Sequence, residues 1–409
     1  MNKKHNVIAN MQGVIASTAK RSLALLTAAG LAFGLAACGD DSSSANGPDP
    51  KDDEEVTSSD SEGDLSSAAA DGSSSSSEET KVSLTGAFFA SDYTTGELRW
   101  IDKDGKVSKK SLSFYQDSRV AVNGADLFVM EGLGTDNITL IDPEKLETEG
   151  EKAVVWQKSM DPTTNPIDMA FDGDKAWVAL QNADSLVQIS TKDGKILKSI
   201  KTGAFNNGEE KSPYVTDIAL DDGKLYAVFA RYDAMYTYPN GLLAVYDAST
   251  GELKDTVQLL THNPKNVVVY DGNVFVATQG DYNDSFATDA DENRGLEKIN
   301  LEKKTSKLFA SGKTLGGGIY QLAAEDGVAY ACVLKTWGAQ LLVKIDLATG
   351  KTETVKGVPD PEFVSVKDGV VYAADRTLGS EKVYVVKDGK ATALDQPKGA
   401  IAPYNIALF

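Results

Sequence analysis

The chain has 409 residues and a formal net charge of −19, with 60 Asp and Glu residues against 41 Lys and Arg residues. Phosphate contacts need basic stripes that such an acidic surface cannot easily supply, so this balance argues against nucleic-acid binding. The only two cysteines are Cys38 and Cys332, and this count excludes a disulfide framework for the part of the chain after Cys38.

The first 37 residues carry basic residues and no acidic residue, and an apolar stretch runs from Leu23 to Ala37. This pattern predicts an export signal, since the stretch is shorter than the roughly 20 residues of a membrane span. The sequence Leu35-Ala36-Ala37-Cys38 resembles the lipobox of bacterial lipoproteins. That resemblance implies that residues 1–37 are a cleaved signal peptide and that Cys38 is lipidated. An ordinary signal peptide is the alternative.

Residues 38–80 contain 13 serines and 13 acidic residues. Low hydrophobicity combined with high charge predicts a disordered tether between the lipidated Cys38 and a folded domain. The acids soon after Cys38, such as Asp40 and Asp41, resemble signals that send lipoproteins to the outer face of the outer membrane. A periplasm-facing anchor is the alternative. We expect an outer-membrane lipoprotein that meets the membrane through its lipid anchor only.

Residues 81–409 contain one sequence motif seven times, counting a half-copy at the end. Each copy is a usually polar residue, three small or apolar residues, an Asp-Gly-type turn and an apolar-aromatic run. The copies begin at Arg119, Asp168, Asp217, Asn266, Gln321, Phe363 and Asn405. A period of about 40 to 50 residues with four short strand patterns is typical of propeller blades.

Each repeat predicts four strands. The first has a small residue at its middle, because innermost strands crowd around the central axis. The third ends in a tight turn such as 247–251, and the fourth is more polar and forms the outer edge. The second carries one aromatic residue that we expect to fill the wedge between blades: Phe128, Trp177, Tyr226, Phe275, Tyr330 and Tyr372.

The two ends of the repeat region complement each other. Residues 85–114 supply three strands with no first strand before them, whereas the last copy supplies only a first strand. Pairing residues 404–409 with the segment from Gly86 would complete a blade and remove two exposed edges. The sequence therefore predicts an all-β, seven-bladed β-propeller of four-stranded antiparallel blades, closed by a C-terminal strand.

The repeats also resemble a known family. Prolines stand before several first strands, at Pro166, Pro213, Pro264, Pro361 and Pro403, and third strands read "VYDASTGEL" or "VKIDLATGKT". With the Asp-Gly turns, these features resemble the YVTN type of seven-bladed propeller over nearly all of residues 85–409. That family spans binding proteins, surface-layer components and proteins of no known activity. Its repeat pattern holds no catalytic motif, so the resemblance implies a fold and not a reaction.

Long loops should gather on one face of the propeller, because tight turns alternate with long connections along each blade. The expected long loops are 156–165, 203–213, 231–241, 279–295 and 311–319. Loops on a rigid scaffold are where binding residues usually lie. The polar residues that start the inner strands should ring the channel mouth on this face: Arg119, Asp168, Asp217, Asn266, Gln321 and Asn405.

Two interpretations of this ring stay open. In the first, the polar residues cap loop backbone and wet the channel. In the second, they bind a ligand together with the residues that end the second strands, namely Glu131, Gln181, Arg231, Gln279, Lys335 and Arg376. The cations among these residues would form a cluster with Arg119 that could hold a carboxylate or sulfate group, since guanidinium forks pair with planar anions.

Aromatic residues in the same loops also allow two interpretations. They could stack on sugar rings or a peptide, or they could cover the ends of the blades. These residues are Tyr232, Tyr236, Tyr238, Tyr282, Phe286 and Trp337.

The loop from Gly280 to Gly295 concentrates oxygen-bearing side chains: Asp281, Asn283, Asp284, Asp289 and Asp291. Calcium takes six to eight oxygen ligands, so this loop is a candidate Ca²⁺ site. Its spacing departs from the EF-hand pattern, and a solvated acidic insertion is the alternative.

Catalytic motifs are missing from the repeats, and His262 is the only histidine after the signal. We interpret His262 as a turn residue and Cys332 as a buried hydrophobe. The leading expectation is a non-catalytic binding or interaction scaffold whose partner is a glycan or an envelope protein. The alternatives are a calcium-assisted propeller hydrolase or lactonase with its site at the channel mouth, and a structural surface protein without a small ligand.

Overall fold

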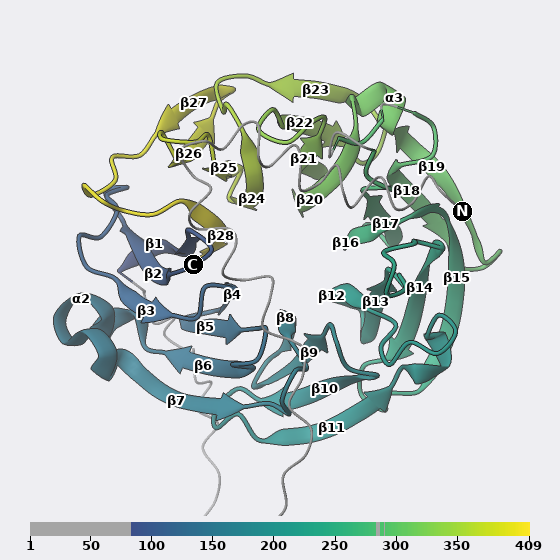
Figure 1. Cartoon of the computed structure of the whole chain (residues 1–409), viewed down its shortest axis with the longest axis horizontal. Coiled ribbons are helices and arrows are strands. Elements are labelled where there is room, and N and C mark those ends of the chain that lie inside the picture. Colours follow the sequence, from purple (N-terminus) through teal and green to yellow (C-terminus); the bar gives the residue numbers. More distant parts are fainter. Residues whose placement is uncertain (1–82, 284–286, 290) are drawn as a thin grey trace, which may run out of the picture. The chain divides into compact units, whose positions relative to one another are not determined.

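The computed structural model describes residues 83–283, 287–289 and 291–409. These residues form seven four-stranded antiparallel sheets, which stand as blades around a central opening (Figure 1). The predicted seven-bladed β-propeller is therefore confirmed. The expected signal peptide, Cys38 and the tether lie outside the described residues. Within the described ranges, no helix has the length and apolar character needed to cross a membrane.

Each blade runs from an inner strand at the channel to an outer strand at the rim. The first blade contains β28 (Pro403–Leu408), β1 (Leu84–Ser91), β2 (Gly96–Asp102) and β3 (Leu112–Phe114). The second contains β4 (Ser118–Asn123), β5 (Asp126–Glu131), β6 (Asn137–Ile141) and β7 (Val154–Ser159). The third contains β8 (Pro166–Asp172), β9 (Lys175–Leu180), β10 (Ser185–Ser190) and β11 (Ile196–Lys201).

The remaining four blades follow the same inner-to-outer order. The fourth contains β12 (Val215–Asp221), β13 (Lys224–Phe229), β14 (Asn240–Asp247) and β15 (Leu253–His262). The fifth contains β16 (Pro264–Tyr270), β17 (Asn273–Thr278), β18 (Gly295–Asn300) and β19 (Thr305–Ser311). The sixth contains β20 (Gly318–Glu325), β21 (Val328–Leu334), β22 (Leu341–Asp346) and β23 (Thr352–Val355). The seventh contains β24 (Pro361–Lys367), β25 (Val370–Asp375), β26 (Lys382–Lys387) and β27 (Lys390–Ala393).

Short helical segments lie in three of the connections. They are η1 (Pro143–Lys145), α2 (Leu146–Glu149) and η2 (Gly150–Ala153) before β7, η3 (Gly203–Phe205) before β12, and α3 (Gly312–Leu315) before β20. Several expected loops are shorter than predicted. Residues 156–159 belong to β7, residues 240–241 to β14 and residues 318–319 to β20.

The ring closes through β28, as the sequence predicts. This strand pairs antiparallel with β1, where Gly86 lies opposite Leu408 and Phe89 lies opposite Asn405. A Cβ atom at Gly86 would lie only 2.7 Å from the carbonyl oxygen of Ala407, so this close pairing requires glycine. Both strand edges are thereby paired, which removes a template for aggregation.

The apolar core is divided into seven clusters, and each cluster joins two neighbouring blades. The second-strand aromatic residues occupy these wedges, as expected. Phe128, Trp177, Tyr226 and Phe275 are buried, and Tyr330 and Tyr372 pack at the margins of their clusters. Cys332 is a buried free cysteine in one of these clusters, which confirms its role as a hydrophobe.

Six of the seven inner strands contain an irregularity near their start. In β8, β12, β16, β20, β24 and β28 one residue has no partner on the neighbouring strand, and the register shifts by one. This is the pattern of a β-bulge, which re-aims side chains. The extra residues are Ile167, Thr216, Lys265, Tyr320, Glu362 and Tyr404. In β4 the register is continuous, with Ser118 opposite Glu131.

Removing residues 403–409 should open the ring. This truncation deletes β28 and exposes the edge of β1, and loss of the buried Ile406 side chain alone should cost about 2–5 kcal/mol. We expect a lower melting temperature and concentration-dependent association, measured by scanning fluorimetry and light scattering. A synthetic peptide of residues 403–409 should restore the melting temperature and a scrambled peptide should not. Equal effects of the two peptides would contradict the closure.

Candidate functional site

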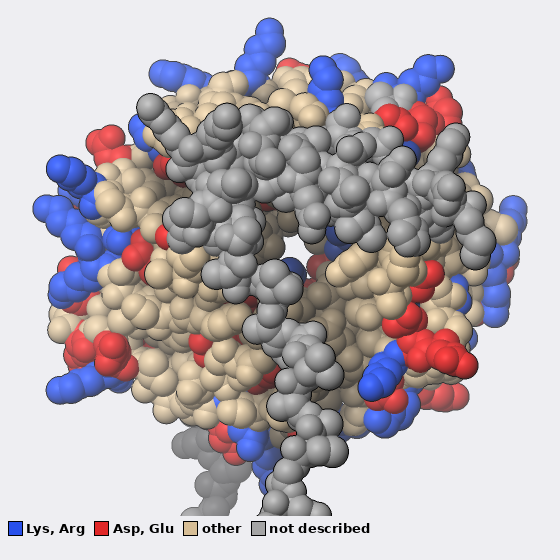
Figure 2. All heavy atoms as spheres, in the orientation of Figure 1, with Lys and Arg blue, Asp and Glu red and all other residues tan. Residues whose placement is uncertain are grey.

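The central channel contains a cavity of about 330 Å³. Every inner strand contributes to its wall, so the cavity lies on the propeller axis. Figure 2 looks along the axis of Figure 1 and shows both basic and acidic atoms at the wall of the central opening. The charged residues of the wall are Arg119, Asp168, Asp217 and Lys265.

Five of the predicted ring residues bind the backbone of the next blade. In each case the side-chain oxygen accepts the N–H of the residue that follows the next ring position. The donors and distances are Ile218 to Asp168 (3.0 Å), Val267 to Asp217 (2.8 Å), Leu322 to Asn266 (2.8 Å), Val364 to Gln321 (2.9 Å) and Val120 to Asn405 (2.6 Å). The ring residues therefore cap the neighbouring inner strand. The sequence predicted that they would cap loop backbone instead.

Arg119 and Phe363 depart from this pattern. Arg119 has no acceptor atom, and its Nη1 instead donates to the carbonyl oxygen of Ile167 at 3.2 Å. Phe363 has no polar side-chain atom and packs against the cluster between the seventh and first blades. The junction between the second and third blades and the junction between the seventh and first blades consequently lack the side-chain oxygen that the other five junctions use.

Asp168 and Asp217 interact inside the channel. Desolvation raises the pKa of Asp217 well above its usual value, and the neighbouring Asp168 raises it further. Desolvation also raises the pKa of Asp168. Two carboxyl groups this close do not ionise together easily, so the pair tends to retain a proton. Both carboxyl groups already accept backbone N–H groups, and Asp217 also accepts from Asn266 at 3.3 Å.

The β-bulges bring a second set of side chains to the cavity. Lys265, Tyr320 and Tyr404 directly precede ring residues, and period-two alternation would send them away from the channel. All three nevertheless line the cavity, since a bulge places two consecutive residues against one partner. Sequence reasoning missed them. The proline at the start of β16 and β28 was the available signal, because proline inside sheets favours first positions and bulges.

Lys265 is a cation without a carboxylate partner. It takes part in none of the ion pairs between described residues, and its Nζ lies over the ring of Tyr320, 5.7 Å from the ring centroid. Desolvation, with a smaller effect of Arg119, lowers the pKa of Lys265 to about 8. Burial also disfavours the charge of Arg119, yet Tyr404 and Asp117 keep its pKa above its usual value. Two cations therefore face the cavity.

The expected cluster of four cations is distributed differently. Only Arg119 lines the cavity. Arg376 pairs with Glu362 at 2.6 Å and lies over the rings of Tyr93 and Tyr404. Arg231 donates to the carbonyl oxygen of Phe205, and Lys335 is exposed between β21 and β22. Lys265, which we did not predict, is the second cation of the cavity.

The loop aromatic residues divide between the two interpretations. Tyr232 stacks on Tyr214 with ring centroids 3.8 Å apart and also contacts Tyr236 and Tyr238, so it covers the end of the fourth blade. Tyr236, Tyr282 and Trp337 are exposed. Phe286 lies outside the described residues.

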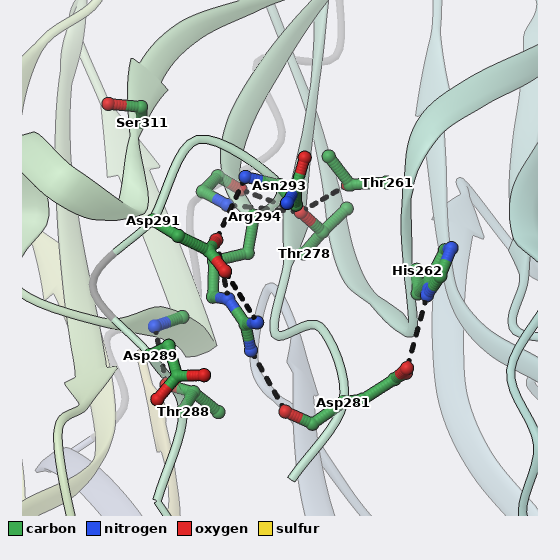
Figure 3. A network of polar contacts seen from close by, with 12 residues as sticks. Thr261, His262, Thr278, Asp281, Thr288, Asp289, Asp291, Asn293, Arg294 and Ser311 are labelled. Carbon is green, nitrogen blue, oxygen red and sulfur yellow. Dashed lines mark hydrogen bonds and ion pairs between the residues drawn. The ribbon is translucent and has the colours of Figure 1, made fainter. Parts of the chain in front are cut away.

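Arg294 organises the acidic loop. Its guanidinium binds both carboxylate oxygens of Asp291, at 3.0 and 3.1 Å, and donates to the carbonyl oxygen of Asp281 at 2.9 Å. The Asp281 carboxylate in turn lies 3.3 Å from His262 (Figure 3). Asn283 donates to Asp289 at 3.2 Å.

The expected calcium ligands therefore have partners within the protein. Asp284, the fifth expected ligand, lies outside the described residues. Across the described ranges, no group of three or more His, Cys, Asp or Glu side chains is arranged to hold a metal ion. The Arg294 guanidinium thus links the backbone carbonyl of Asp281 to the carboxylate of Asp291.

No protein-family model matches this chain, and no curated protein matches it. Solved structures do match. Apo AztD from Citrobacter koseri is 12% identical over 80% of this chain and 98% of that chain, with a TM-score of 0.49. A nidogen/laminin complex is 15% identical over 67% and 95% of the two chains, with a TM-score of 0.44. The computationally designed protein Ika8 is 14% identical over 69% and 76%, with a TM-score of 0.43. Similarity this low carries no argument about function.

Replacing Asn266 by Leu should destabilise the ring. The substitution keeps the approximate volume but leaves the Leu322 N–H without its acceptor, at a cost of about 1–3 kcal/mol. Phe363→Leu is the matched control at the equivalent position, because Phe363 accepts no hydrogen bond. It tests for the cost of altered packing alone. Chemical denaturation of both variants would measure the difference, and equal losses would contradict the inter-blade bond.

Arg294→Gln should loosen the acidic loop. It removes a two-pronged ion pair whose arginine side chain is only 9% exposed, so we expect a loss of about 1.5–3 kcal/mol and faster proteolysis within residues 280–295. Lys313→Gln is the control, since its exposed pair with Glu292 at 3.8 Å should contribute little. Calcium should not protect the wild-type loop, and protection by calcium would support a metal site instead.

Proposed function

We propose that this protein is a lipid-anchored, extracytoplasmic binding protein whose channel cavity takes a ligand with an anionic group. The proposed location rests on the export-signal pattern and on the lipobox-like residues that end at Cys38. The observation that supports the ligand class most directly is the pair of cations, Lys265 and Arg119, that faces the cavity.

Charge within the cavity favours an anion. The carboxyl groups of Asp168 and Asp217 already accept hydrogen bonds from neighbouring backbone, and they tend to share a proton. Lys265 has no such partner. A cation removed from water is costly unless an opposite charge or a hydrogen-bond acceptor reaches it. A carboxylate or sulfate placed beside Lys265 and Arg119 would satisfy both cations.

The aromatic residues of the cavity wall suggest the class of molecule that carries the anionic group. Tyr320, Phe363 and Tyr404 come from three consecutive blades and line the same cavity as the cations. Flat rings of this kind stack on sugars, and a volume of about 330 Å³ is at the lower end of the usual range for ligand pockets, about 300–1,000 Å³. We propose an acidic sugar, or the acidic end of a glycan, as the ligand.

A second candidate is an envelope-protein partner on the long-loop face. The loops that join second to third strands in six of the seven blades carry exposed large apolar residues. They are Tyr93, Leu133, Met235, Tyr236, Tyr282, Trp337 and Leu378. Exposed apolar residues that gather on one face favour protein contact. The calcium-assisted hydrolase gains no comparable support, because the expected ligands Asp291, Asp281 and Asp289 contact Arg294, His262 and Asn283 respectively.

Binding of an acidic sugar should depend on Lys265. We expect glucuronate to bind and glucose to bind far more weakly, and Lys265→Met should weaken glucuronate binding about 10- to 100-fold. Lys313→Met is the control, because Lys313 is an exposed residue of α3 and does not line the cavity. Isothermal titration calorimetry on residues 81–409 measures both sugars against the wild-type protein and the two variants. An unchanged affinity in Lys265→Met would contradict the proposal.

The same binding should weaken at alkaline pH. Free Lys265 loses its proton as the pH passes about 8, and a bound anion favours the protonated form. Affinity should therefore be nearly constant well below pH 8 and fall above it, with proton uptake on binding near pH 8. Titrations in buffers of different ionisation enthalpy measure this uptake. Lys265→Arg should abolish the pH dependence while it keeps the affinity.

A further inference from the structure

Lys265 has the surroundings of a nucleophilic amine. The bulge in β16 places it on the cavity wall, and no described carboxylate pairs with it. Lysine amines become reactive when they are desolvated in a pocket or lie beside another cation, because both effects favour the neutral amine. Lys265 meets both conditions, since desolvation and Arg119 together bring its pKa to about 8.

The cavity also supplies proton donors for carbonyl chemistry. Desolvation and Asp168 raise the pKa of Asp217, so its carboxyl group tends to stay protonated. Tyr404 and burial raise the pKa of Tyr320 well above its usual value, so its phenol also keeps its proton. Tyr320 is the residue whose ring lies beside the Lys265 ammonium. An amine and two weak acids therefore line one cavity.

We propose that Lys265 captures a 2-oxo acid as a reversible imine, with the carboxylate of the ligand held by Arg119. This inference rests on the proposed anion-binding function and narrows its ligand to a carboxylate with a carbonyl group on the neighbouring carbon. Arg119 suits the carboxylate, because it lies near enough to Lys265 to influence its charge. A lysine without its own counter-ion suits the carbonyl.

The chemistry balances without a further reactant. The lone pair of the Lys265 nitrogen forms a bond to the carbonyl carbon while the C=O π bond breaks, and the carbonyl oxygen takes up the proton that the nitrogen loses. The hydroxyl group then leaves as water with a proton from Tyr320 or Asp217, and the nitrogen lone pair forms the C=N bond. The products are an iminium ion, water and the deprotonated form of the acid. Hydrolysis reverses each step, so the capture is binding and consumes no oxidant or reductant.

Reductive trapping tests the proposal. Purified residues 81–409 are incubated with pyruvate and cyanoborohydride at pH 7.5, digested and mapped by mass spectrometry. We expect the adduct on Lys265 to form at least about tenfold faster than on any other lysine, because an ordinary lysine holds far less neutral amine at this pH. Lactate, which lacks the carbonyl group, should leave no adduct and should slow trapping by pyruvate.

Lys298 is the internal control within the same chain. It also lies over aromatic rings, 5.4 Å from the Phe275 centroid and 5.8 Å from that of Phe309, but it does not line the cavity. Lys265→Arg keeps the positive charge and cannot form an imine, so it should lose the adduct at this position. Lys298→Arg should leave the adduct on Lys265 unchanged.

The outcomes separate this inference from the proposed function. Equal trapping of Lys265 and Lys298 in the wild-type protein would overturn the imine, whatever the variants do. If calorimetry still shows that carboxylates bind in a Lys265-dependent way, the anion-binding function stands. If neither trapping nor carboxylate binding occurs, both proposals fail. Selective trapping that Lys265→Arg abolishes and Lys298→Arg leaves intact would support the capture.

Discussion

The backbone of each inner strand has one side without a neighbouring strand, and this constraint shapes the whole channel. An N–H group on that side needs an acceptor, since an unpaired polar group away from water is costly. At five of the seven junctions, a side-chain oxygen from the preceding blade supplies it. A polar channel is therefore a requirement of closure, and the ring residues by themselves indicate no ligand. Side chains of the cavity that these inter-blade hydrogen bonds do not need are therefore the ones that point to a ligand.

Departures from the repeat are concentrated around the cavity. The strand β4 is the inner strand without a bulge, and its ring position holds Arg119 in place of an acceptor. Phe363 leaves another junction without a side-chain acceptor, beside Tyr404 of the closing strand. Lys265 adds a cation that no inter-blade bond needs. Repetition explains the scaffold. Arg119 and Phe363 keep structural contacts of their own, with the Ile167 carbonyl oxygen and with the core cluster between the seventh and first blades.

The repeats were sufficient to predict seven blades, the closure by residues 404–409 and the inner-ring positions, because each follows from spacing and strand count. The cavity was predicted less well. Alternation places Lys265, Tyr320 and Tyr404 on the wrong side of their strands, and only a bulge brings them inward. Arg376 was expected at the mouth as a free cation, but its partner Glu362 comes from a neighbouring strand, and sequence spacing does not show that pairing.

The division of the core explains why a ligand in the channel would affect the entire ring. Each apolar cluster joins only two blades, so no single cluster stabilises the whole, and every blade depends on both neighbours. The channel cavity is different, because all seven inner strands contribute to it. An anion that links Lys265 of β16 with Arg119 of β4 would connect blades that share no core cluster. Binding there stabilises the closed ring by mass action against every opening of a blade junction.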